Sequence, residues 1–277
     1  MEGQIIKILS NLYTVNSNGK NYECHVRGKF RNDKITPTVG DYVKFDAKNN
    51  YILEILPRKN TLERPLVSNI DRCIIVTSCK QPDFSANLLD KLLVILEYHN
   101  IEPIICLTKL DLLNESELKE INKIRKYYQY IGYTVLDNEN IPDIKKVLKN
   151  NTVVLTGQTG AGKSSLINKL DPNLELETGE ISKALGRGKH TTRHVELIEM
   201  YGGKILDTPG FSSIDLNVLT KEDIKNGFIE FNDYKCIYSD CTHIKENECK
   251  VLEAVKNGEI LESRYENYKK FIETDRR

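Results

Sequence analysis

Short runs of alternating apolar and polar residues fill about the first 65 positions of the chain. Successive side chains of a β-strand point to opposite faces, so the alternation predicts half-buried strands at 5–9, 12–15, 22–26, 41–45 and 51–56. Turn-forming residues separate these runs, as at 16–19 and 48–50. Five short strands favour a small β-barrel of the OB type.

From about residue 70 to residue 215, apolar strands alternate with longer segments of helical spacing. Strands are predicted at 73–77, 103–108, 133–136 and 152–156, and helices at 86–99 and 115–130. Asn114 and Glu117 suit a capping box at the start of the second helix, and Gly132 suits its end. This order predicts an α/β domain with a largely parallel sheet, whose ligands gather at the carboxyl ends of the strands.

A glycine-rich loop follows the predicted strand 152–156 and precedes another helical segment. It fits the phosphate-binding loop of P-loop NTPases, in which backbone N–H groups and a helix N-terminus surround the phosphates. Lys163 would neutralise the β- and γ-phosphates, and Ser164 would bind Mg²⁺. The predicted nucleotide-binding residues of this loop are Gly157, Gln158, Thr159, Gly160, Ala161, Gly162, Lys163, Ser164 and Ser165.

The segment Thr108, Lys109, Leu110, Asp111 ends another predicted strand and is similar to the Asn-Lys-x-Asp motif that recognises guanine. A carboxylate at Asp111 can accept hydrogen bonds from both the ring N–H and the exocyclic amine of guanine, whereas adenine has an acceptor in place of that ring N–H. Lys109 would lie over the base. Thr108 replaces the usual Asn, so we expect a weaker tether to the phosphate-binding loop. Alone, the segment could be an ordinary strand-to-helix turn; beside a phosphate-binding loop, base recognition is favoured.

Asp207 to Gly210 follows a predicted strand at 204–206 and is similar to the Asp-x-x-Gly motif, whose carboxylate reaches Mg²⁺ and whose glycine senses the γ-phosphate. The segment 186–193 before it is a candidate first switch, in which a threonine hydroxyl binds Mg²⁺ when the γ-phosphate is present. We favour Thr192 over Thr191 for this role.

An ordinary GTPase has its base-reading motif after the phosphate-binding motifs, whereas here it comes first. A circularly permuted GTPase domain is therefore predicted.

Three cysteines and one histidine gather within fourteen residues: Cys236, Cys241, His243 and Cys249. Zn²⁺ prefers four tetrahedral sulfur and nitrogen ligands, so this set predicts one zinc ion. Because four protein ligands leave no position for water, the ion would be structural and would supply folding energy to a small local core. The alternative is a set of unligated side chains. Residues 251–272 have helical spacing, interrupted at Gly258.

The composition argues against a membrane protein. No run approaches the about 18 apolar residues that a membrane helix needs, and the first residues lack signal-peptide character, so we expect a cytoplasmic protein. The 40 basic and 40 acidic residues cancel, and bulk charge predicts no polyanionic partner. Disulfides are rare in a reducing cytosol, so Cys73, Cys79 and Cys106 should be buried thiols of the strands.

Aromatic and basic residues occur together in the predicted barrel. The aromatic residues are Tyr13, Tyr22, Phe30 and Tyr42, and the basic ones are Arg27, Lys29, Arg31 and Lys34. Residues 1–68 carry eleven Lys and Arg against seven Asp and Glu, a net charge of +4. These side chains could form a stacking surface for RNA, or equally the barrel core and its solvated face.

The order of these parts resembles the RsgA (YjeQ/YloQ) family of small-ribosomal-subunit biogenesis GTPases. Further segments similar to that family occur at 27–30, 39–41, 58–60, 64–65, 69–71, 186–192 and 264–268, so the resemblance covers nearly the whole chain. It implies GTP or GDP, Mg²⁺ and one Zn²⁺ as ligands, and a monomer that binds the small ribosomal subunit and its rRNA late in maturation. It also implies that the subunit stimulates hydrolysis, which times release. The chain departs from the family at Thr108, and at Leu136, Asp137 and Asn138, where a Ser-Ala-like base loop is expected.

Catalysis needs a residue that orients the attacking water. Ras-like proteins have Gln after the Asp-x-x-Gly motif, whereas this chain has Phe211, which cannot orient water by hydrogen bonding. His190 in the candidate switch is a substitute, and the family resemblance points the same way. An idle, exposed histidine is the alternative. The predicted catalytic residues are His190, Lys163 and Thr192.

These interpretations divide the chain into an OB-fold RNA-binding domain at 1–67, a permuted GTPase domain at 68–219 and a zinc-binding helical domain at 220–277. Two other functions stay open. The first is a nucleotide-dependent RNA-binding scaffold whose hydrolysis is incidental. The second is an ATP-using small-molecule kinase, which leaves Asp111 and the cysteine cluster unexplained.

Overall fold

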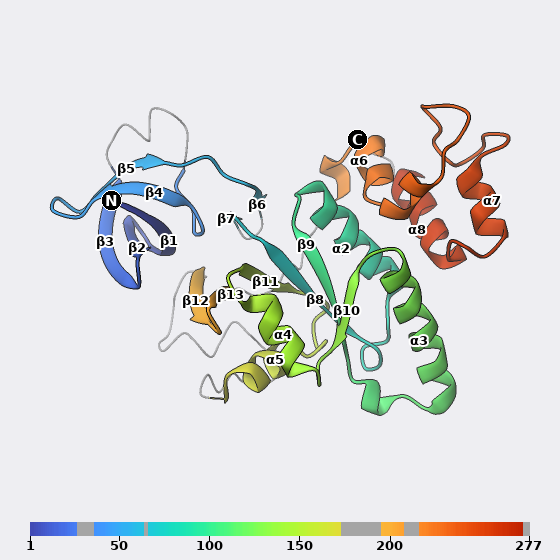
Figure 1. The fold of residues 1–277 in the computed structure, drawn as a ribbon, viewed down its shortest axis with the longest axis horizontal. Helices are drawn as coiled ribbons and strands as arrows, with labels where there is room; N and C mark the ends of the chain where they lie inside the picture. The colour runs from blue at the N-terminus through green and yellow to red at the C-terminus, as the bar shows by residue number, and fades with distance from the viewer. Residues whose placement is uncertain (27–35, 64–65, 173–194, 208–215, 274–277) are drawn as a thin grey trace.

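The computed structural model describes residues 1–26, 36–63, 66–172, 195–207 and 216–273, with only the backbone of Asp207. The N-terminal barrel and the C-terminal helices lie at opposite ends of the molecule, and the α/β sheet lies between them (Figure 1). Within this described part of the chain, each helix is too short or too polar to span a bilayer.

Five strands form a closed barrel: β1 (Glu2–Leu9), β2 (Leu12–Ser17), β3 (Lys20–Val26), β4 (Tyr42–Asp46) and β5 (Tyr51–Ile55). β1 pairs with β2 and β4, β2 pairs with β3, and β5 closes the ring between β4 and a parallel β3. Buried apolar side chains, including Ile5, Val15, Phe45 and Ile52, fill the interior. All five predicted strands are confirmed, with ends displaced by a few residues, and the ring order is that of an OB barrel.

The central sheet contains five parallel strands in the order β10-β9-β8-β11-β13. They are β8 (Arg72–Ser78), β9 (Glu102–Thr108), β10 (Thr134–Asp137), β11 (Thr152–Thr156) and β13 (Gly203–Asp207). β12 (Glu196–Met200) pairs antiparallel with β13, and its Glu196 also pairs with Lys7 of β1. The sheet therefore continues into the barrel. A small hairpin, β6 (Thr61–Glu63) and β7 (Leu66–Ser68), connects the two parts.

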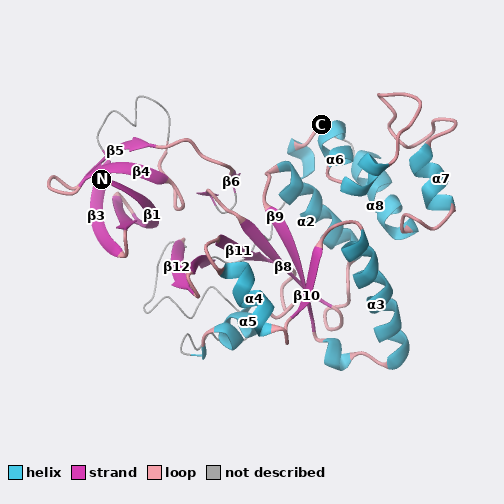
Figure 2. Ribbon diagram, in the orientation of Figure 1, coloured by secondary structure: helices cyan, strands magenta, loops and turns pink. Residues whose placement is uncertain are grey.

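Helices cover both faces of the sheet, as the sequence predicts (Figure 2). α2 (Ala86–Tyr98) and α3 (Glu115–Tyr130) pack on one face, against alternate strand residues such as Cys73 and Ile75. α4 (Ile141–Leu148) and α5 (Lys163–Leu170) pack on the other face, against residues such as Ile74 and Cys106. The predicted buried thiols Cys73, Cys79 and Cys106 are confirmed as buried. The Asn114–Glu117 capping box is also present.

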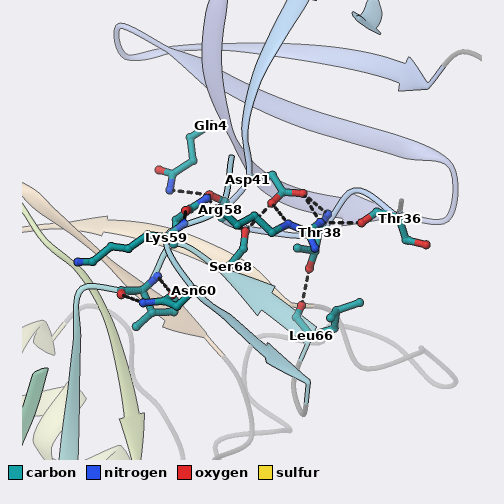
Figure 3. Close-up of polar contacts among 12 residues, drawn as sticks. Gln4, Thr36, Thr38, Asp41, Arg58, Lys59, Asn60, Leu66 and Ser68 are labelled. Atoms are coloured by element: carbon teal, nitrogen blue, oxygen red, sulfur yellow. Dashed lines mark hydrogen bonds and ion pairs between the residues drawn. The ribbon is translucent and has the colours of Figure 1, made fainter. Parts of the chain in front are cut away.

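A buried carboxylate organises the connection between the barrel and the sheet (Figure 3). Asp41 is 0% exposed and accepts two hydrogen bonds from the Arg58 guanidinium, at 2.7 and 2.8 Å. It also accepts one from the Ser68 hydroxyl at 2.6 Å and one from the Thr38 N–H at 2.8 Å. Arg58 and Ser68 both belong to the connecting segment. Asp41 at the start of β4 is thus bonded to the segment that leads into the sheet.

The C-terminal part is helical and packs on the outer face of α2. It contains η3 (Leu216–Val218), α6 (Lys221–Asn226), η4 (Ile229–Asp233), α7 (Lys250–Lys256) and α8 (Glu262–Glu273). The predicted helical segment with its break at Gly258 is confirmed, because α7 and α8 flank that residue. Val94 and Ile95 of α2 share a core with Phe228 and Tyr268 of this part. α2 therefore has one side on the sheet and the other on the C-terminal helices.

A second buried polar network lies at this contact. The Arg264 guanidinium, 0% exposed, donates to Asp90 of α2 at 2.6 Å and to both carboxylate oxygens of Glu230. Asp90 also accepts from the Tyr128 hydroxyl at 2.5 Å and from the Asn267 amide at 2.7 Å. The network joins α2, α3, η4 and α8. Its members lie far apart in the sequence, and local patterns did not predict it.

Candidate functional site

The glycine-rich loop lies at the carboxyl end of β11, where the sheet topology predicts a ligand. Gly157 has a φ of 136°, and a β-carbon there would lie 2.1 Å from the Val76 carbonyl oxygen. Only glycine lets the loop pass this close to β8. Gly162 has a φ of 100° and stands directly before α5, whose first residue is Lys163. The loop and the helix N-terminus therefore have the arrangement that binds phosphate.

Lys163 is the first residue of α5, and its side chain turns back into the loop. The Nζ atom donates to the carbonyl oxygens of Gly157 at 2.6 Å and Gln158 at 2.8 Å. Burial lowers the pKa of the Lys163 ammonium. The neighbouring Ser164 is buried, with 7% exposure. The ammonium thus lies within the loop, where an anionic phosphate would satisfy a partly desolvated charge better than carbonyl oxygens do.

The base-reading segment lies beside this loop. β9 ends at Thr108, and the Thr108 hydroxyl donates to the Ala161 carbonyl oxygen at 2.6 Å. The hydroxyl therefore ties the two loops together directly, and the expectation that this tether is weaker than one made by Asn stays a prediction. Thr108 is only 2% exposed, so water does not compete for this hydrogen bond. Lys109 has a φ of 58° and donates to the Gln81 carbonyl oxygen, and Asp111 is exposed in the turn η1 (Leu110–Leu112).

The segment after β10 occupies the place of the expected base loop. Asp137 ends β10, and its carboxylate accepts from the N–H groups of Glu139 and Asn140, each at 3.2 Å. The Asn138 N–H donates to the Leu107 carbonyl oxygen at 3.0 Å, so this turn is attached to β9 just before Thr108. An aspartate-capped turn therefore stands where a Ser-Ala-like base loop was expected.

Asp207 ends β13, which runs parallel to β11 and delivers its backbone to the same edge of the sheet. The other predicted residues of this group, Gly210, Phe211, His190, Thr191 and Thr192, lie outside the described residues. The described structure thus brings Thr108, Lys109, Asp111 and the 157–165 loop to one edge of the sheet, together with the backbone of Asp207.

The four predicted metal ligands converge in one place. The His243 Nδ1 atom and the three cysteine Sγ atoms all lie within 4.8 Å of one another, and three of the four residues are buried. The Cys236 and Cys249 sulfurs are 3.8 Å apart. A tetrahedral zinc ion with bonds of about 2.3 Å to sulfur requires edges of about 3.8 Å, so the cluster fits one zinc ion.

The turn that carries His243 is held by its neighbours. His243 has a φ of 60°, and its carbonyl oxygen accepts from the Tyr265 hydroxyl at 2.8 Å. The Glu246 carboxylate accepts from the Thr242 hydroxyl and from the N–H groups of Thr242, Ile244 and Lys245. Burial opposes ionisation of Glu246, but these hydrogen bonds lower its pKa to about 2. Glu246 was not among the predicted site residues, although a carboxylate within a run of metal ligands is a readable signal.

The barrel aromatic residues have different environments. Tyr13 is buried in the barrel core, and Tyr22 packs on Phe45 with ring centroids 5.1 Å apart. Tyr42 is 47% exposed. Phe30 and the basic residues Arg27, Lys29, Arg31 and Lys34 lie outside the described residues. For Tyr13 and Tyr22, the core interpretation is therefore the right one.

Two family models match the chain: that described as RsgA GTPase over residues 55–217, and that described as RsgA N-terminal domain over residues 2–52. The chain belongs to the RsgA GTPase family. A relative from Oceanobacillus iheyensis, named small ribosomal subunit biogenesis GTPase RsgA 2, is 49% identical over 98% of this chain and 96% of its own length. An Enterococcus faecalis RsgA is 47% identical over 98% of this chain and 94% of its own length.

Solved structures agree with this family assignment. The crystal structure of YloQ, described as a circularly permuted GTPase, has a TM-score of 0.83 at 38% identity and covers 98% of this chain and 93% of its own. YjeQ from Thermotoga maritima has a TM-score of 0.86 at 36% identity and covers 98% of this chain and 96% of its own.

Membership of the RsgA family makes this chain a GTPase, with GTP, GDP and Mg²⁺ as the implied ligands. The predicted permutation and the OB-like barrel are confirmed.

Proposed function

We propose that this GTPase binds the small ribosomal subunit late in its maturation and that GTP hydrolysis times its release. The observation that carries the nucleotide site is the hydrogen bond from Thr108 to Ala161, which joins the base-reading turn to the phosphate-binding loop. The partner is proposed from the relatives, which are named small ribosomal subunit biogenesis GTPases.

Each predicted residue has a role in this proposal. Asp111 and Lys109 bind the guanine, and the 157–165 loop surrounds the phosphates. Lys163 neutralises the phosphates, while Ser164 and Thr192 bind Mg²⁺. The Asp207 carboxylate reaches Mg²⁺, and the Gly210 N–H senses the γ-phosphate. His190 positions the attacking water once the subunit is bound.

The three parts of the chain would divide the work. We place an rRNA-binding barrel at 1–67, the GTPase domain at 68–219 and a zinc-stabilised domain at 220–277. The exposed Tyr42 ring and the +4 charge of residues 1–68 support RNA contact by the barrel. The converging Cys₃His set supports the zinc ion, which would stabilise the turn between Cys236 and Cys249.

A first experiment tests the catalytic role of His190. His190→Ala should lower subunit-stimulated GTP turnover by about 10²-fold or more, the usual contribution of a positioned general base, while the Kd for GDP stays near the wild-type value. His99→Ala is a matched control, because His99 caps the far end of α2 at the opposite edge of the sheet. An unchanged stimulated kcat in His190→Ala would remove His190 from the mechanism.

A second experiment tests timing by hydrolysis. The chain should co-sediment with small subunits when loaded with a non-hydrolysable GTP analogue and leave them after GTP is hydrolysed. Equal release rates with GTP and the analogue would favour the scaffold function instead. ATP that displaces GTP at similar concentrations would favour the kinase.

A further inference from the structure

The loop between β8 and α2 lies against both halves of the nucleotide site. It leaves the carboxyl end of β8, the strand between β9 and β11, so it starts between the base-reading turn and the phosphate-binding loop. The Cys79 N–H donates to the Thr108 carbonyl oxygen at 3.1 Å. On the other side, a β-carbon built on Gly160 would lie 3.6 Å from Pro82. Residues 78–82 are here called the Lys80 loop.

The Lys80 loop holds one end of the base-reading turn. The Lys109 ammonium donates to the Gln81 carbonyl oxygen. Within the loop, the Ser78 hydroxyl donates to the carbonyl oxygen of Lys80, the residue before Gln81, at 2.9 Å. The side chain proposed to lie over the base is therefore directed by a neighbouring backbone atom.

The Lys80 loop also contacts the start of α3, which follows the base-reading turn. The Lys80 Nζ atom contacts both carboxylate oxygens of Glu117, at 2.7 and 2.9 Å. Glu117 accepts as well from the Asn114 N–H at 2.9 Å, which closes the capping box at the start of α3. One carboxylate thus serves two donors, and Lys80 connects the start of α3 to the loop.

Asp111 lies between these two attachment points. Its side chain is exposed and makes no hydrogen bond or ion pair with any other described residue. Its position therefore follows from where Lys109 and Asn114 are held. A carboxylate that must meet two donors on the edge of guanine needs such support from its flanks.

We propose that Lys80 is a positioning residue for guanine recognition. Its ion pair with Glu117 fixes the start of α3 relative to the Lys80 loop, whose Gln81 carbonyl directs Lys109. Lys80 acts through Glu117 and touches no nucleotide atom. This inference rests on the base site of the proposed function.

The test compares two nucleotides in the full chain. Lys80→Met keeps the apolar stem and removes the charge, and should raise the Kd for GDP about fivefold, the upper range for a partly exposed ion pair. IDP lacks the exocyclic amine and depends less on the alignment of Asp111, so its Kd should rise less than about twofold. The preference for guanine over hypoxanthine falls, while kcat at saturating GTP stays unchanged.

Two variants separate positioning from general loss of charge. Lys80→Arg keeps the ion pair and should restore the wild-type ratio of the two Kd values. Lys123→Met removes an exposed ion pair with Glu120 on α3, the helix that carries Glu117. It should leave the Kd values for GDP and IDP unchanged.

Equal rises for GDP and IDP, or no rise in Lys80→Met while the wild type prefers GDP, would overturn this inference alone. A wild type that binds ADP as tightly as GDP would overturn the base site, and the inference with it.

Discussion

A buried carboxylate lies at each junction between the central α/β part and the two parts that flank it, Asp41 at the barrel and Asp90 at the C-terminal helices. The two junctions differ in exposure and in charge balance. Asp41 at the barrel faces one guanidinium, and the Arg58 side chain is 25% exposed. At the C-terminal helices, one guanidinium faces two carboxylates, and the Arg264, Asp90 and Glu230 side chains are at most 2% exposed. Water can reach the first network if it breaks, whereas the second is closed.

The free-energy cost of removing a charged side chain depends on whether water can reach the partners that remain. A partly exposed partner regains water, so the loss stays close to the value of the hydrogen bonds. A sealed carboxylate cannot regain water and leaves an uncompensated charge in the interior. Loss of the Asp41 charge leaves the partly exposed Arg58, whereas loss of Arg264 leaves two sealed carboxylates, so the second substitution should cost more.

The largest effect is expected at the closed network. Arg264→Met keeps much of the side-chain volume but leaves Asp90 and Glu230 without their cation, and should lower the free energy of unfolding by about 3–5 kcal/mol. Urea denaturation measures this. Lys269→Met, which removes a partly exposed ion pair with Glu266 on α8, is the matched control. A loss below about 1 kcal/mol would show that the network is not sealed.

The pH dependence of that variant sharpens the comparison. Burial raises the pKa of Asp90, and Arg264 opposes the rise. Without Arg264 the folded-state pKa rises further above the unfolded value, so the folded variant binds a proton more tightly than the unfolded chain. The difference in the free energy of unfolding between the wild type and Arg264→Met should therefore be smaller at about pH 5 than at about pH 8.

A smaller effect is expected at the open network. Asp41→Asn keeps the shape but weakens the charged hydrogen bonds to Arg58 and Ser68, and should cost about 2 kcal/mol. The same urea experiment measures it. If Asp41→Asn proved as damaging as Arg264→Met, exposure would not explain the difference between the junctions.

The smallest effect is expected at the outermost contact between barrel and sheet. Lys7 and Glu196 form an ion pair at 2.7 Å, with side chains 32% and 35% exposed. Lys7→Met should cost no more than about 0.5 kcal/mol, and 0.5 M salt should remove the difference. A salt-insensitive loss would mean that the β1–β12 pairing, not the charge, was disturbed.

Local patterns predicted the barrel strands, the main α/β elements, the phosphate-binding loop and the metal ligands. Each of these depends on neighbours in the sequence, such as the glycines around Lys163 or the spacing of Cys236 and Cys241. α4 was not predicted, because it has only eight residues and no long apolar period.

The connections between elements could not be predicted in the same way. Lys80 and Glu117 have the composition of ordinary surface residues, and only the fold brings them together. The partner of the Thr108 hydroxyl was likewise not readable from the motif, because only the fold brings the Ala161 carbonyl oxygen of the phosphate-binding loop within its reach.

The sequence separation of the two carboxylate networks has a consequence for synthesis of the chain. Asp41 meets Ser68 across 27 positions, so its network can close soon after the barrel leaves the ribosome. Asp90 waits for Arg264, 174 positions later. Until α8 is made, a nascent chain carries Asp90 without its cation, and the part of the apolar side of α2 that α8 covers is bare. Premature termination within α8 should therefore be far more harmful than the twelve residues of this helix suggest.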